Sequence, residues 1–292
     1  MRKFILLTVA ALLWVAAPAS AQNAPAPKPI LTSIDHVPMV ELYDGGGGLP
    51  YLGSSTSYNA GDWESALRTY ANGPDGLPGG ADSVYIQQVG QIDAIADAAI
   101  KHATPHGWRA KVRRARAAAK HDHGHGHGHG RGHGHGHGHG NDNAKMPAIV
   151  FDVDETLLSN LTAIETDNFT FGPASQAEAT NEIGVAIPPS LALYNDAKAR
   201  GLTIFLITGR RENTRAHTEH NLQTQGFTGY KQLFLKPDAS TDSTVVYKSG
   251  ARATIEQMGY KIVANVGDQY SDLAGGHSQS AFKLANPFYF LP

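Results

Sequence analysis

The sequence predicts an α/β fold, in which a parallel, doubly wound sheet carries helices on both faces and a small cap insert. From Met146 onward, apolar β-rich runs alternate with helical segments, which is the order of a βαβ sheet. The first run, 148–151, is uncharged, as a strand buried on both faces would be. It leads directly into Asp152 and Asp154, which an extended backbone places on one side.

The amino terminus is predicted to be a secretory signal over residues 1–21. Arg2 and Lys3 precede an uncharged apolar stretch, and Ala19-Ser20-Ala21 follows as an A-x-A cleavage site. The apolar stretch is shorter than the roughly 20 residues of a membrane span. We expect secretion across the inner membrane to a bacterial periplasm, and an uncleaved anchor is the competing interpretation. The sequence contains no cysteine, so a lipid-modified cysteine is excluded and no stable membrane anchor is expected.

Residues 22–80 are predicted to be mostly irregular, because prolines and four consecutive glycines interrupt them. One short helix is expected within this segment, at 62–71. Residues 81–120 are predicted to be helical. Over 82–102, apolar residues recur every three or four positions, which indicates a face that packs on the main domain.

Residues 121–145 form a low-complexity tract in which histidine alternates with glycine. Histidine stands at positions 121, 123, 125, 127, 129, 133, 135, 137 and 139. Closely spaced imidazoles are good ligands for Zn²⁺, Ni²⁺ or Cu²⁺, so the tract is a candidate transition-metal site. A solvated linker without a metal role is the competing interpretation. Flexible ligands cannot hold a preorganised catalytic geometry, so we expect any active site elsewhere.

The charge balance gives no support to a nucleic-acid-binding protein. The formal net charge is −2, and loss of Arg2 and Lys3 with the signal would make it −4. A nucleic-acid binder should present a basic face instead. Residues 109–120 are locally basic, but a solvated helix face is the simpler explanation.

Residues 146–292 form the predicted main domain. The apolar runs expected as strands are 148–151, 202–207, 233–235 and 261–266. Helices are expected at 188–200, at 211–225 and from Tyr247 to about Gly259. A polar insert at about 161–188 is long for a connection between a strand and a helix, so we expect it to be the cap over the strand tips.

Polar and charged residues follow three of these strands, at the edge where parallel strands end. The relevant stretches are Asp152–Asp154, Thr208-Gly209-Arg210 and Gly267–Asp272, with Lys248 near the start of a helix. The strand tips of a doubly wound sheet share one crevice, which is where such folds bind ligands. Converging carboxylates, a lysine and a Thr-Gly pair are suited to a metal ion and a phosphate group.

Taken together, these motifs resemble the haloacid dehalogenase (HAD) superfamily, and within it the class B-like acid phosphatase branch. That branch includes plant acid phosphatases, vegetative storage proteins and bacterial lipoprotein acid phosphatases. The stretches that carry the resemblance to the branch are Tyr247-Lys248-Ser249, Arg252, Gly259-Tyr260, Gly267-Asp268-Gln269, Ser271-Asp272-Leu273 and Ala285-Asn286-Pro287-Phe288-Tyr289. The resemblance covers roughly Met146 to Pro292. It implies a HAD-like Rossmannoid sheet and Mg²⁺-dependent hydrolysis of small-molecule phosphomonoesters, with 5′-nucleotides among the candidates.

The resemblance also implies a role for each residue at the strand tips. Asp152 would attack phosphorus and form an aspartyl-phosphate, and Asp154 would act as general acid and then general base. Thr208 and the backbone N–H of Gly209 would hold phosphate oxygens. Lys248 would bind phosphate too and would stabilise charge in the transition state.

One Mg²⁺ per active site is the implied cofactor. Its ligands would be carboxylate oxygens of Asp152 and Asp268 and the backbone carbonyl of Asp154, in a shell of hard oxygen atoms. Asp272 would have a supporting role, holding either Lys248 or a metal-bound water.

Several other residues carry open alternatives. Lys236 also follows a strand and is the rival of Lys248. Arg210 and Arg211 are candidates for substrate contact, with a salt bridge at a helix start as the equal alternative. Glu155 points away from the two aspartates in an extended chain and is given no catalytic role. His217, His220 and His277 are expected to be surface or packing residues, with a role as ligands as the alternative. Phe169 and Phe171 are expected to pack within the cap, with stacking on a nucleobase as the alternative.

Three functional hypotheses follow. The first is an exported phosphomonoesterase. The second is a metal-buffering protein that uses the histidine tract. The third is a phosphotransferase that uses the same active-site residues with an alcohol acceptor. Physiological substrate, pH optimum and oligomeric state stay open from the sequence.

Overall fold

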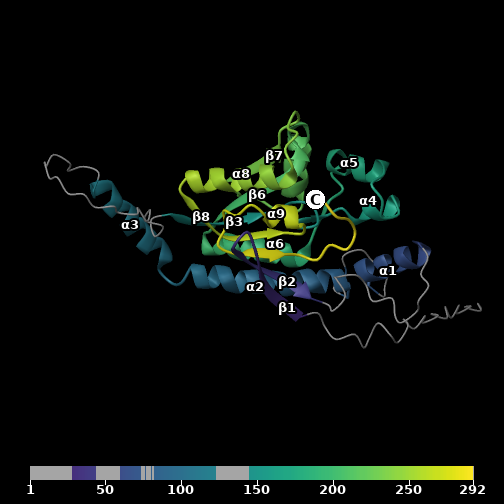
Figure 1. The fold of residues 1–292 in the computed structure, drawn as a ribbon, viewed down its shortest axis with the longest axis horizontal. Helices are drawn as coiled ribbons and strands as arrows, with labels where there is room; N and C mark the ends of the chain where they lie inside the picture. Colours follow the sequence, from purple (N-terminus) through teal and green to yellow (C-terminus); the bar gives the residue numbers. More distant parts are fainter. Residues whose placement is uncertain are drawn as a thin grey trace, which may run out of the picture.

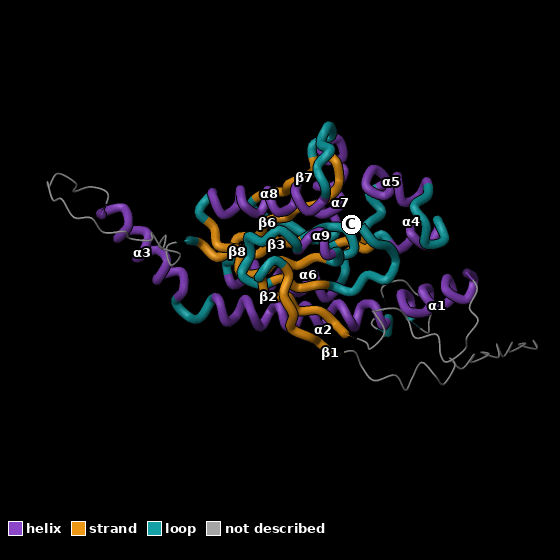
Figure 2. Tube along the Cα trace, viewed as in Figure 1, coloured by secondary structure: helices purple, strands orange, loops and turns teal. Residues whose placement is uncertain are grey.

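The computed structural model describes residues 28–43, 60–73, 76, 80, 82–122 and 145–291, and a seven-stranded sheet lies at its centre (Figures 1 and 2). The strand order is β1-β2-β9-β8-β3-β6-β7. The strands are β1 (Lys28–Ile34), β2 (Val37–Tyr43), β3 (Met146–Phe151), β6 (Thr203–Arg211), β7 (Gln232–Lys236), β8 (Tyr260–Gly267) and β9 (Ala281–Lys283). All neighbouring pairs are parallel except β1–β2. The parallel α/β fold expected from the sequence is therefore confirmed.

Helices cover both faces of this sheet. Outside the cap, the described helices are α1 (Ala60–Asn72), α2 (Val84–Ala103), α3 (Trp108–Asp122), α6 (Pro188–Arg200), α7 (Arg215–Thr224), α8 (Thr244–Gln257) and α9 (Tyr270–Leu273), with a 3₁₀ turn η2 at Glu212–Thr214. In Figure 1, α8 lies on one side of the strands and α2 and α6 lie on the other. Helix α6 occupies the predicted range and ends at Gly201, whose φ of 76° suits glycine.

The position of the central strand β3 explains why its sequence is apolar throughout. Ile149 and Phe151 belong to the core cluster formed with α2 and α6, while Ala148 and Val150 pack with residues of α8. Successive side chains of a strand point to opposite faces, so a strand covered on both sides needs apolar residues at every position.

The N-terminal segment corrects one expectation. The sequence predicts 22–80 as mostly irregular, yet residues 28–43 form the β1–β2 hairpin at one edge of the sheet. Asp35 and His36 both have positive φ, 48° and 66°, as a tight two-residue hairpin turn requires. Pro29 weakens the strand pattern of β1, but β1 is the edge strand and tolerates proline because one row of its N–H groups is not needed for pairing. The apolar residues that alternate on either side of Asp35-His36 were the sequence pattern that could have predicted this hairpin.

The predicted cap is a small insert between β3 and α6. It contains a two-stranded sheet of β4 (Leu158–Ser159) and β5 (Val185–Ala186), and the helices α4 (Leu161–Thr166) and α5 (Pro173–Asn181). Figure 1 shows α4 and α5 together at one end of the molecule, next to the chain's C-terminal end.

Two further element boundaries differ from the expectation. Strand β6 continues through Thr208-Gly209-Arg210 to Arg211, so these residues lie within a strand. Helix α8 begins at Thr244, capped by Ser243, which places Lys248 in its second turn. The predicted signal at 1–21 and nearly all of the histidine tract at 121–145 lie outside the described residues. Among the helices that are described, none is both long enough and apolar enough to cross a bilayer.

Candidate active site

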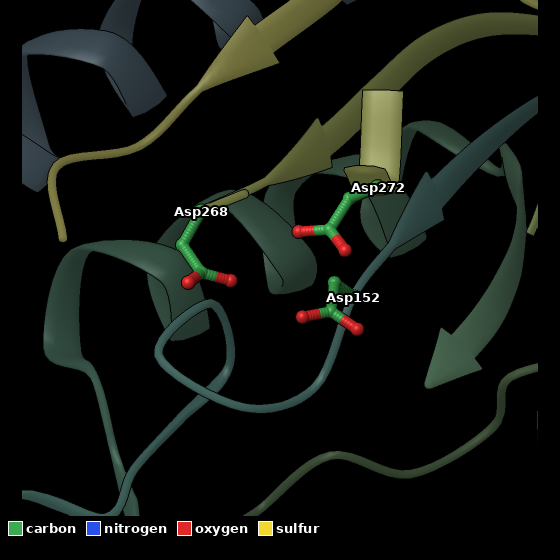
Figure 3. A group of neighbouring side chains, drawn as sticks. All are labelled: Asp152, Asp268 and Asp272. Carbon is green, nitrogen blue, oxygen red and sulfur yellow. The ribbon is translucent and has the colours of Figure 1, made fainter. Parts of the chain in front are cut away.

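Three carboxylates and one lysine form a buried cluster at the carboxyl ends of the central strands. Asp152 follows β3, Asp268 follows β8 and Asp272 lies in α9. One carboxylate oxygen from each lies within 4.8 Å of the others, and Figure 3 shows the three side chains turned toward one another. The Nζ of Lys248 is 2.6 Å from an oxygen of Asp152 and 2.6 Å from an oxygen of Asp272. Tertiary structure thus brings together residues from three separate stretches of sequence.

The electrostatics of the cluster leave it short of positive charge. If ionised, the three carboxylates exceed Lys248 by two negative charges. Burial raises the pKa of the Asp152 carboxyl well above its ordinary value, and the neighbouring charges of Asp272 and Asp268 add to this rise. Burial opposes the charged form of Lys248, but its two aspartate partners outweigh burial and raise its pKa. Lys248 therefore stays protonated.

The donor set fits a hard divalent cation. Carboxylate oxygens are the ligands that Mg²⁺ and similar ions select in proteins, and a divalent cation would balance the two surplus charges. Asp152 and Asp268, both predicted as ligands, belong to this triad, and Asp272 joins them. The side chain of Asp154 lies outside the triad, and the metal contact predicted for its backbone carbonyl stays a prediction.

Asp154 is held by an arginine that the sequence left ambiguous. Arg210 donates from Nε at 3.0 and 3.2 Å and from Nη2 at 2.6 Å to the Asp154 carboxylate. Asn160 Nδ2 donates to the same carboxylate at 2.8 Å. Burial raises the pKa of Asp154, but Arg210 and the hydrogen bonds outweigh it, so the net direction is downward. The carboxylate is therefore ionised in this conformation.

A bulge in β6 accounts for the position of Arg210. Thr208 pairs with Leu235 of β7, and the next pair is Arg211 with Lys236, so β6 has two extra residues at this step. Bulges re-aim side chains next to active sites. The predicted salt bridge of Arg210 exists, but it starts from a bulged strand and not from a helix start.

Thr208 and Gly209 line the same region. Thr208 is fully buried, and its Oγ1 donates to Asp154 at 3.4 Å and accepts the backbone N–H of Arg210 at 3.1 Å. A Cβ built on Gly209 would meet no atom within 4 Å, so its backbone faces open space. The phosphate-binding role predicted for these two residues stays a prediction.

The loop that carries Asp272 is tightly fixed. Asp272 Oδ2 accepts the backbone N–H of Gln269 at 2.8 Å, which caps α9 and leaves Oδ1 to Lys248. Gly267 is required here, because a Cβ at this position would lie 2.6 Å from the Cβ of Asp272. The buried Arg252 donates to the backbone oxygens of Asp272, Ala274 and Gly276. Arg252 therefore holds the loop and does not contact the carboxylate cluster directly.

The structure also resolves the rival assignments. Lys236 donates to the backbone oxygen of Asp242 and has no contact with the carboxylate triad. His217 and His220 both bond Glu182, and His277 bonds Glu256, all on the surface. Phe169 packs with Phe288, with ring centroids 6.2 Å apart, whereas Phe171 of the cap is 79% exposed.

Two groups near the site were not assigned a role from the sequence. Glu155 is buried and accepts hydrogen bonds from Asn160 N at 2.6 Å and Tyr289 OH at 2.8 Å, which makes it a structural residue. Glu178 of the cap helix α5 has its pKa raised to about 8, by burial and by the charge of Asp154. The cap therefore places a carboxyl group near Asp154.

The family model described as HAD superfamily, subfamily IIIB (acid phosphatase), matches residues 95–292. The chain belongs to this family. The family match includes every residue of the cluster, all of α3 and the C-terminal part of α2. The resemblance predicted from the strand-tip motifs is therefore confirmed, and so is its HAD-like fold.

Curated relatives of this family member include acid phosphatase 1 of Solanum lycopersicum, 38% identical over 148 residues, and vegetative storage protein 1 of Arabidopsis thaliana, 35% identical over 148 residues. Each alignment covers 49% of this chain, and 58% and 55% of the two relatives. The chain thus spans somewhat more than half the length of the curated relatives it matches. The solved class C acid phosphatase from Bacillus anthracis with tungstate bound is 18% identical, with a TM-score of 0.42, over 69% of this chain and 87% of that one.

Proposed function

We propose that this protein is an acid phosphatase that hydrolyses small-molecule phosphomonoesters with Mg²⁺. The observation that carries the proposal is the cluster of Asp152, Asp268 and Asp272 around Lys248, in a chain of the HAD acid phosphatase family. The cluster provides a nucleophile, a fixed cation and oxygen ligands for a metal within one buried space. Those are the components that transfer of a phosphoryl group needs.

Asp152 is the proposed nucleophile. Lys248 bonds Oδ1 of Asp152, and Oδ2 has no hydrogen-bond partner among the described residues, so one oxygen is oriented and the other is available. Attack of this oxygen on phosphorus forms an aspartyl-phosphate and releases the alcohol, and water then hydrolyses the acyl phosphate. Thr208 and the backbone N–H of Gly209 would bind phosphate oxygens beside it. Lys248 offsets the repulsion between the carboxylate and the phosphate.

Asp154 is the proposed general acid and base, and its pairing with Arg210 constrains when it acts. In the free protein Asp154 is ionised, so it has no proton to give to the leaving alkoxide. A phosphate dianion bound by Thr208 and Gly209 would compete for the guanidinium of Arg210, because arginine binds phosphate in a bidentate manner. Release of Arg210 raises the proton affinity of Asp154. An acidic medium favours the same protonation.

A divalent cation held by the carboxylates of Asp152, Asp268 and Asp272 would supply charge neutralisation for the approaching phosphate. Mg²⁺ is proposed because the ligand set consists of carboxylates, without nitrogen or sulfur. The other reaction steps depend on the side chains named above.

The proposal is tested by phosphate release from a panel of phosphomonoesters at acidic and neutral pH, with Mg²⁺ and then with EDTA. We expect turnover that requires the metal and disappears in Asp152→Asn. A circular dichroism spectrum equal to that of the unmodified protein controls for folding. Turnover by Asp152→Asn at the unmodified rate would refute the assigned nucleophile.

Export, substrate preference and acceptor are further parts of the proposal. We propose a periplasmic location on the strength of the signal-like sequence at 1–21. Nucleotides belong in the substrate panel, although Phe169 is engaged in packing and Phe171 is the aromatic ring that the cap exposes. Addition of an alcohol acceptor to the assay separates hydrolysis from phosphotransfer.

A further inference from the structure

Asp268 differs from the other carboxylates of the site in its partners. Asp152 and Asp272 share the ammonium group of Lys248, and Asp154 is paired with Arg210. In the described part of the chain, Asp268 has no salt-bridge partner. Its negative charge is therefore the least compensated by direct contacts.

Neutral groups surround the Asp268 carboxylate instead. Asn286 Nδ2 and Gln269 Nε2 each donate to Oδ2 at 2.7 Å, and Thr156 Oγ1 donates to Oδ1 at 3.1 Å. Neutral donors fix the direction of a carboxylate without cancelling its charge. This is the arrangement expected around a metal ligand, since partners behind the ligand orient it toward the ion.

Asn286 is the donor that comes from the C-terminal segment of the described chain. It lies in residues 286–291, which we call the C-terminal strap. Its Oδ1 accepts the backbone N–H of Phe288 at 2.9 Å, so one side chain both turns the strap and bonds Asp268. Gln269 makes the reciprocal contact, because its Oε1 accepts the backbone N–H of Leu291 at 3.1 Å.

The strap is held at several further points. Phe288 is buried and packs edge-on against Tyr85 of α2, with centroids 5.1 Å apart, and it stacks with Phe169 of the cap. Tyr289 OH donates to Glu155 in the loop that follows the nucleophile. Figure 1 shows the chain's C-terminal end beside the cap helices α4 and α5. The strap thus joins the loop after β3, the loop after β8, helix α2 and the cap.

We infer that Asn286 is a positioning residue for the metal ligand Asp268, and that the seating of the C-terminal strap sets the affinity of the site for Mg²⁺. The inference rests on the proposed function, because it takes the carboxylate triad as the metal site. Loss of the Asn286 donor leaves Asp268 free to rotate, and a ligand must then be ordered when the ion binds. Loss of such an outer partner typically lowers metal affinity by about 10- to 100-fold.

The test is Mg²⁺ binding by the full chain, measured by calorimetry without substrate, together with the Mg²⁺ dependence of phosphate release. Two variants separate the two roles of the side chain. Asn286→Ala removes the donor to Asp268 and the acceptor for Phe288. Asn286→Ser retains an oxygen near the Phe288 N–H but is too short to reach Asp268. Gln257→Ala, which removes an exposed amide at the end of α8, is the control.

We expect both Asn286 variants to bind Mg²⁺ about 10- to 100-fold more weakly and to regain most of the turnover at saturating Mg²⁺. The control should match the unmodified chain. Unchanged Mg²⁺ affinity in Asn286→Ala would overturn the inference while leaving the proposed function intact. Full affinity in Asn286→Ser would also overturn it, since the turn alone would then matter. If the unmodified chain showed neither Mg²⁺ binding nor turnover, the proposed function would fail, and this inference with it.

Discussion

Asp93 provides a quantitative test of how burial affects this fold. The residue lies on α2, is 3% exposed and faces α6, where Ser190 Oγ donates to its Oδ2 at 2.8 Å. Its Oδ1 has no hydrogen-bond partner among the described residues. Burial raises the pKa of Asp93 from 3.8 to about 7, and the bond from Ser190 opposes the rise. The carboxyl is therefore neutral in the folded protein at acidic pH.

The sign of the effect on stability follows from proton binding. Between pH 3.8 and about 7, Asp93 is protonated in the folded protein and ionised in the unfolded chain. The folded state binds more protons, so the free energy of unfolding falls as pH rises through this window. At about 1.4 kcal/mol for each pH unit between the two pKa values, the loss is about 4 kcal/mol.

The perturbation is Asp93→Asn, which cannot ionise. The buried amide brings an extra donor that costs about 1–3 kcal/mol at every pH. Urea denaturation at pH 4 and at pH 8 should show the variant gaining about 4 kcal/mol relative to the unmodified protein between the two pH values. Asp82→Asn, an exposed position just before the same helix, should show no such gain. An Asp93→Asn offset that is equal at both pH values would refute the reasoning.

Three more outcomes test the site. Arg252→Met removes one hydrogen-bond donor from each of three backbone oxygens and should lower the free energy of unfolding by about 3 kcal/mol in urea titrations. A loss below about 1 kcal/mol would contradict the role of Arg252 in holding the loop. Gly267→Ala should destabilise the fold by about 1–3 kcal/mol and reduce turnover at least about 10-fold, because the new methyl displaces Asp272. Thermal melts measure the loss of stability and initial rates measure the loss of turnover. An unchanged rate would contradict a displacement of Asp272. Arg210→Met removes one partner of a buried ion pair and should cost about 3 kcal/mol at neutral pH. The ionised Asp154 stabilises the fold above its ordinary pKa, and this stabilisation is lost as pH falls through its lowered pKa in the folded protein. The loss of stability in Arg210→Met should therefore shrink in strong acid. A loss that stays constant with pH would exclude the ion pair as its cause.

Local sequence patterns predicted much of the fold. The apolar run ending before Asp152 indicated a central buried strand, and Pro188 with Gly201 delimited α6 correctly. These features depend on residues within a few positions of one another, so a linear pattern records them. The β1–β2 hairpin was missed because proline weakens a strand pattern, and the edge position that tolerates proline is a property of the whole sheet.

Part of the site was likewise predictable from the sequence, and part was decided only by the tertiary structure. The sequence by itself predicted that Asp152 and Asp268 share a site, because strand-tip residues of a parallel sheet converge. The family resemblance favoured Lys248 over Lys236 as the cation beside them. Only the tertiary structure decided that Lys248, and not Lys236, reaches the carboxylates. A bulge in β6 directs Arg210 to Asp154, and the C-terminal strap brings Asn286 to Asp268. Strand pairing and chain closure determine such contacts between distant residues, and neither has a local signature in the sequence.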